Sequence, residues 1–271
     1  MSLHDRYARL TPYEHLLPEE SFADERFPLI RKEGRERGGG ALSLPERFVL
    51  LKEAVAVLTS VREGGEDPRL TQQRGALLFH AFHFWDAGCP LFLLSTPVAR
   101  FVVGTGPAEG RWSPALPGRA GYVQLPQHLF WVPGGEGTPP ESVDGYFWSA
   151  PSPEQLSILV VLGMREDRPG LSVVPLPTLP LAAAGIWASL QVRPQGKDFQ
   201  PSFLPGAGLE DLYALQAGAE AVKLSMRVFW YLDSFPGSVE RGKGPEATGS
   251  PVEPPRPSAL EYRRIVLGER N

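Results

Sequence analysis

Residues 121–177 read GYVQLPQHLFWVPGGEGTPPESVDGYFWSAPSPEQLSILVVLGMREDRPGLSVVPLP. Short apolar runs, rich in β-branched and aromatic residues, alternate here with turn residues, which is typical of an antiparallel sheet. Because the run 156–163 is almost continuously apolar, we expect a central strand there, buried on both faces and paired in a hairpin with 171–176. Because the run 122–126 ends in a proline and the run 145–150 is flanked by prolines, we expect both strands nearer an edge of the sheet. The predicted strands are YVQLP (122–126), LFWV (129–132), GYFWSA (145–150), LSILVVLG (156–163) and LSVVPL (171–176).

Helical periodicity occurs on both sides of this region. Ser43 and Glu46 have capping-box spacing at the start of an apolar pattern that predicts a helix over roughly 45–62. The fold class is therefore α+β, a mostly antiparallel sheet of about five strands packed by three main helices. The other two main helices are predicted at 71–87 and 209–233, a short helix at 97–103, and a helix rather than a strand at 179–192.

The length of 271 residues fits one domain with appendages. Residues 1–42 are polar and irregular and are interpreted as an N-terminal arm, and residues 43–235 as a single α+β domain. Residues 236–271 are interpreted as a Pro/Gly-rich linker and C-terminal segment. Within this segment GSVERGKG (237–244) matches part of a phosphate-loop pattern but lacks its Ser or Thr, whereas SALEYRRIVLGE (258–269) can dock on the body.

Composition narrows the function classes. A net charge of −4 argues against a general polyanion binder, whose affinity comes from Lys and Arg. The single cysteine, Cys89, excludes an intramolecular disulfide and a multi-thiolate zinc site, and it fits a reducing compartment. Neither an export signal nor a membrane span is visible. We therefore expect a soluble, cytoplasmic protein.

The segment HAFHFWDAGC (80–89) holds the candidate metal ligands. His80, His83 and Asp86 follow one another at helical spacing, and two imidazoles with a carboxylate suit a divalent metal. This spacing is not a diagnostic signature, however. The competing interpretation places both histidines inside a mixed core and Asp86 at the helix end. No other cofactor is predicted.

A second candidate site consists of His128 and Asp144, on loops between predicted strands. A carboxylate and an imidazole form an acid–base pair where the fold brings them together. The competing interpretation is turn formation, because Asp144 precedes Gly145 between apolar runs.

Aromatic residues are dense on two neighbouring predicted strands. Side chains alternate between the two faces of a strand, so some of these aromatics point outward unless a helix or a partner covers them. The candidate binding residues are Phe130, Trp131, Tyr146 and Trp148. An exposed patch of this kind marks a binding surface, either for a protein or for stacked bases. Coverage by the chain's own helices is the alternative. A protein partner is expected rather than nucleic acid.

Together these patterns favour a non-catalytic binding or accessory protein that acts through the aromatic sheet face. Two alternatives stay open. One is an enzyme, either a metal-assisted hydrolase or an acid–base catalyst. The other is a nucleic-acid-binding protein. The sequence does not indicate an oligomeric state.

Overall fold

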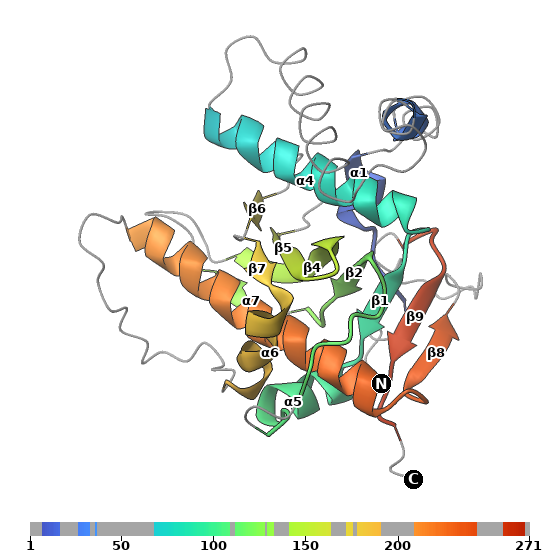
Figure 1. Cartoon of the computed structure of the whole chain (residues 1–271), viewed down its shortest axis with the longest axis vertical. Coiled ribbons are helices and arrows are strands. Elements are labelled where there is room, and N and C mark those ends of the chain that lie inside the picture. Colours follow the sequence, from blue (N-terminus) through green and yellow to red (C-terminus); the bar gives the residue numbers. More distant parts are fainter. Residues whose placement is uncertain are drawn as a thin grey trace, which may run out of the picture.

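The chain folds as a mixed, mostly antiparallel sheet with helices on both faces (Figure 1). The computed structural model describes residues 7–16, 27–32, 36, 68–108, 112–127, 129–132, 141–163, 172–175, 178–190, 209–242 and 257–268. In sheet order the strands are β6 (Ser172–Pro175), β5 (Gln155–Leu162), β4 (Glu141–Ser152), β2 (Ala120–Gln124), β1 (Leu91–Leu94), β9 (Tyr262–Ile265) and β8 (Val239–Gly242). Off this path, β3 (Trp131–Val132) pairs with β4, and β7 (Leu179–Pro180) pairs with β5. Among these pairings β1 is parallel to β2 and to β9, and the rest are antiparallel. The α+β fold class is confirmed.

The helices lie in two layers with the sheet between them (Figure 1). On one face α4 (Pro68–Asp86) and α1 (Pro12–Leu16) pack over the sheet. On the other face lie α5 (Thr96–Gly104), α6 (Leu181–Ser189) and α7 (Leu209–Ser234). The helices predicted at 71–87, 97–103 and 209–233 are confirmed, and the segment predicted at 179–192 forms β7 followed by α6. The helix predicted at 45–62 lies outside the described residues.

Side chains of β5 point alternately toward the two helix layers. Ile158 and Val160 point into the cluster under α7, whereas Leu159 and Val161 point into the cluster under α4. Both faces of this strand are therefore buried, as its continuous apolar run predicts. Its antiparallel partner β6 confirms the predicted hairpin.

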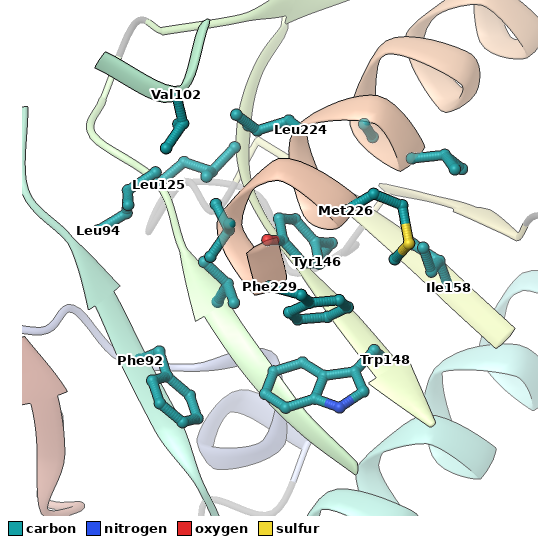
Figure 2. Close-up of a cluster of buried hydrophobic side chains, with 14 of the residues drawn as sticks. Phe92, Leu94, Val102, Leu125, Tyr146, Trp148, Ile158, Leu224, Met226 and Phe229 are labelled. Atoms are coloured by element: carbon teal, nitrogen blue, oxygen red, sulfur yellow. The ribbon is translucent and has the colours of Figure 1, made fainter. Parts of the chain in front are cut away.

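The main core lies between α7 and the sheet (Figure 2). Trp148 of β4 packs edge-on against Phe229 of α7, with ring centroids 5.3 Å apart. Its indole also lies across β2, where Gly121 is its register partner. A β-carbon at Gly121 would lie 2.0 Å from the indole ring, so only glycine leaves room for it.

Two predicted edge positions were wrong. Strands β2 and β4 lie inside the sheet, each with neighbours on both sides. Pro126 comes after β2 ends, and Pro151 falls where the β4–β5 register shifts, between Ser149 and Ser152. Neither proline therefore interrupts a regular ladder of hydrogen bonds, so neither one excludes its strand from the interior of the sheet.

Besides β7, which lies in the segment predicted as a helix, three of the described strands were not predicted. The run LFLL of β1 is completely buried and follows α4 after a short turn. A short apolar run of this kind cannot be separated from a buried helix by periodicity. Strands β8 and β9 lie in the C-terminal segment 236–271, and β9 places 262–265 beside β1. In the part of the chain that the structure describes, no helix has the length and apolar character needed to cross a membrane.

Candidate functional site

The four predicted binding aromatics do not share an exposed face. Tyr146 and Trp148 are 0 and 1% exposed and lie beneath α7, as Figure 2 shows. Phe130 is also buried in this cluster. Trp131 of β3 is 39% exposed. Alternation directs the first three side chains to the α7 side of the sheet, so the chain's own helix covers them.

The three predicted metal ligands on α4 make three separate contacts. His80 is buried, with Nε2 3.4 Å from the Ser157 hydroxyl oxygen of β5. The His83 ring packs edge-on against Phe79, with ring centroids 4.7 Å apart. Asp86 Oδ1 forms an ion pair with Arg31 Nε at a distance of 2.9 Å. Within the described residues, no group of three or more His, Cys, Asp or Glu is arranged to hold a metal ion.

Both histidines are neutral in the folded chain at neutral pH. Burial, reinforced by the neighbouring His83, lowers the pKa of His80 to about 3. Burial also lowers the pKa of His83 to about 4. A base this weak is a poor proton acceptor at neutral pH, since effective general bases have a pKa near the working pH.

Asp144 belongs to a buried polar lock between the N-terminal segment and the sheet. Its Oδ1 accepts hydrogen bonds from Arg9 Nε at 3.0 Å and Nη2 at 2.8 Å. Its Oδ2 accepts the Tyr122 hydroxyl at 2.5 Å, and burial together with this carboxylate raises the pKa of Tyr122. The backbone N–H of Arg9 also donates to Gln124 Oε1 at 2.7 Å. His128, the other half of the predicted acid–base pair, lies outside the described residues.

A second polar cluster joins segments from the two ends of the chain. Glu14 Oε2 accepts from the Thr11 N–H at 2.7 Å, which completes a capping box at the start of α1. The same carboxylate accepts from the Ser258 hydroxyl at 3.0 Å and from the Ala259 N–H at 2.8 Å. Residues 257–259 are thereby held against α1, shortly before β9 begins.

Arg227 of α7 fixes the ends of two other helices. Its guanidinium donates to the carbonyl oxygens of Val102 at 3.0 Å and Val103 at 2.8 Å, in the last turn of α5. It also donates to Ala188 at 3.0 Å and Leu190 at 2.7 Å, at the end of α6. The carboxyl ends of helices carry partial negative charge, so one cation stabilises both ends. Burial lowers the pKa of Arg227, but arginine stays charged.

Helix α6 is held close to the body on one side and exposed on the other. Its buried positions are small, Ala184, Gly185 and Ala188, which allows a close approach to α7. A β-carbon at Gly185 would lie 2.9 Å from Pro114 Cδ, so the segment that contains Pro114 also packs tightly against α6.

The outer side of α6 carries a row of apolar residues. Ala182, Ile186 and Leu190 recur every fourth position and are all exposed, Ile186 by 62% and Leu190 by 40%. No residue of the helix is charged. We call these three residues the α6 stripe. The sequence signal for the α6 stripe is that LAAAGIWAS is apolar on every side of the helix.

No protein-family model and no curated protein matches this sequence. Among solved structures, the chain is similar to the crystal structure of AcrVA2, at 10% sequence identity and a TM-score of 0.43. The similarity covers 93% of this chain and 81% of that chain. A likeness at this level does not bear on what the present chain binds.

Proposed function

We propose that this chain is a non-catalytic binding protein that docks a protein partner through the α6 stripe. The observation that carries the proposal is the exposure of Ile186 on a helix without a charged residue. Contiguous exposed apolar residues on a folded surface mark interaction sites. An aliphatic anchor between Ala182 and Leu190 fits an apolar groove on a partner.

The stripe is presented rigidly. Arg227 binds the carbonyl oxygens of Ala188 and Leu190, and Pro114 packs against Gly185 on the inner side. A helix already fixed in its bound conformation loses little entropy on association, which favours affinity. Burying Ile186 in a partner should contribute about 1–2 kcal/mol, or roughly 5–30-fold in affinity.

The polar groups support a binding role rather than catalysis. Asp144, Glu14 and Arg227 are each engaged by two or more groups of the same chain. These side chains hold the N-terminal segment, the C-terminal segment and three helices in place. Their hydrogen bonds are made within the chain and stabilise its fold.

A comparison of two charge-introducing variants tests the proposal. Ile186→Glu places a carboxylate in the middle of the α6 stripe. The control, Leu29→Glu, places a carboxylate at a position outside the stripe that is 55% exposed. Full-length wild type and both variants are purified gently from the producing cells, and co-purifying proteins are identified by mass spectrometry. We expect one stoichiometric partner with wild type and Leu29→Glu, lost with Ile186→Glu. Retention of that partner by Ile186→Glu would refute docking through α6.

The salt dependence of binding provides a second readout. Because the stripe has no charge, the partner's affinity should change less than about threefold between 50 and 500 mM salt. Binding that falls steeply with salt would instead indicate the nucleic-acid alternative.

A further inference from the structure

Strand β8 ends the described sheet beyond β9, on the side away from β5 and β6 (Figure 1). It pairs with β9 in the register Val239 to Ile265 and Gly242 to Tyr262. Its exposed residues, Glu240 and Arg241, lie at the middle of the strand. The outer edge of a sheet offers unpaired backbone groups to another extended chain.

The register identifies which backbone groups point outward. The Val266 N–H donates to the Ser238 carbonyl at 2.8 Å, so this pair is a hydrogen-bonded one. Hydrogen-bonded and non-hydrogen-bonded pairs alternate in an antiparallel ladder. Glu240 and Gly242 therefore bond to β9, whereas the N–H and C=O groups of Val239 and Arg241 face away from it.

Residue 241, whose backbone groups face outward, also carries a positive charge that lies opposite another positive charge. Arg241 lies directly opposite Arg263 of β9, in a non-hydrogen-bonded pair, where side chains come closest. Both are exposed, and the Arg263 guanidinium lies 5.3 Å from the centre of the Phe92 ring. Like charges placed directly opposite each other are unfavourable. On the other face of β8 and β9, the facing side chains have opposite charges, and Arg264 Nη1 lies 3.8 Å from Glu240 Oε2.

Within the described residues, neither Arg241 nor Arg263 has an acidic partner within ion-pair distance. An ion pair with a ligand would relieve the repulsion between them. The ligand's chemistry then follows from two features that coincide at residue 241: outward backbone groups that accept a strand, and a side chain that attracts a carboxylate.

We propose that β8 binds an extended acidic segment of a partner protein, which adds to the sheet as a further strand. The backbone of the segment pairs with Val239 and Arg241, one of its acidic side chains contacts Arg241, and Arg263 lies one strand further away. Nucleic acid satisfies the two cations but does not supply the main-chain donors and acceptors that the edge requires. The inference is independent of the α6 stripe.

A defined peptide tests this edge without knowledge of the natural partner. Binding of full-length protein to labelled (Glu-Val)₄ is measured by fluorescence anisotropy at low salt. Arg241→Gln should weaken binding about two- to fivefold, and Arg263→Gln should weaken it less, because it lies a strand further from the peptide. Arg100→Gln, at an exposed site on α5, is the matched control and should leave binding unchanged.

Two peptide controls separate strand addition from plain charge attraction. A (Glu-Val)₄ peptide N-methylated at alternate residues keeps its charge but loses main-chain donors, and (Lys-Val)₄ reverses the charge; neither should bind measurably. Hydrogen exchange should show new protection of the Val239 and Arg241 amides with (Glu-Val)₄. Equal binding of the N-methylated peptide, no binding of (Glu-Val)₄ at millimolar concentration, or tighter binding of single-stranded DNA lost in both arginine variants would each overturn the proposal.

Discussion

Replacing Arg227 with methionine should lower the free energy of unfolding by about 3–5 kcal/mol. The side chain makes four hydrogen bonds to carbonyl oxygens, 2.7 to 3.0 Å long. Hydrogen bonds from a charged donor contribute about 1.5–3 kcal/mol each. Burying the guanidinium offsets several kcal/mol of that total. Methionine fills a similar volume, so little of the loss comes from a cavity.

Urea unfolding followed by circular dichroism measures this difference. For a domain of this size, the loss corresponds to a melting temperature lower by about 8–15 °C. Arg100→Met makes the same chemical change at an exposed position of α5 and should stay within about 0.5 kcal/mol of wild type.

Hydrogen exchange localises the effect. Amides in the last turns of α5 and α6 should exchange faster in the Arg227→Met protein, because their carbonyl ends lose the cation that holds them. An unfolding free energy within about 1 kcal/mol of wild type, or loosening elsewhere with both helices unaffected, would refute the role assigned to this side chain.

Three further variants test the packing and the buried charges. Gly121→Ala should cost about 1–3 kcal/mol or more, because its β-carbon meets the Trp148 indole, and the near-ultraviolet circular dichroism of that tryptophan should change. Asp144→Asn leaves the Arg9 guanidinium buried without its counter-ion and should cost about 3–5 kcal/mol in urea unfolding; a loss below about 1 kcal/mol would contradict the lock. For His80 the folded-state pKa lies below the unfolded value of 6.5, so the unfolded chain binds the proton first and stability falls as pH drops from about 6.5 through about 3. The stability difference between wild type and His80→Gln should therefore shrink by roughly 2–3 kcal/mol from pH 7 to pH 4.5; a difference independent of pH would show that the imidazole is not kept neutral.

The sequence predicts the large regular elements well. Helices α4 and α7 show apolar periodicity over many turns, and β5 has a continuous apolar run between turn signals. The misses share a physical cause. Strand β1 is four buried residues long, and β9 is polar at two of its four positions. Both acquire their strand character from the parallel pairing between them, a long-range contact that local patterns do not encode.

The candidate sites were harder to predict because the roles of their residues depend on burial. Tyr146 and Trp148 alternate as a strand should, but the sequence cannot show that α7 covers their face. His80 and Asp86 share a helix, yet β5 engages the first and Arg31 engages the second. The role of Arg227 depends on carbonyl oxygens that are distant in sequence, so no local motif marks it.

Photo-crosslinking in the producing cells tests the central claim, docking through the α6 stripe, most directly. Benzoylphenylalanine is introduced at position 186 in one full-length protein and at position 29 in another, two sites of similar exposure. The account predicts that one protein is captured in high yield from position 186 and not from position 29. No adduct from position 186, or the same adduct at equal yield from both positions, would contradict it.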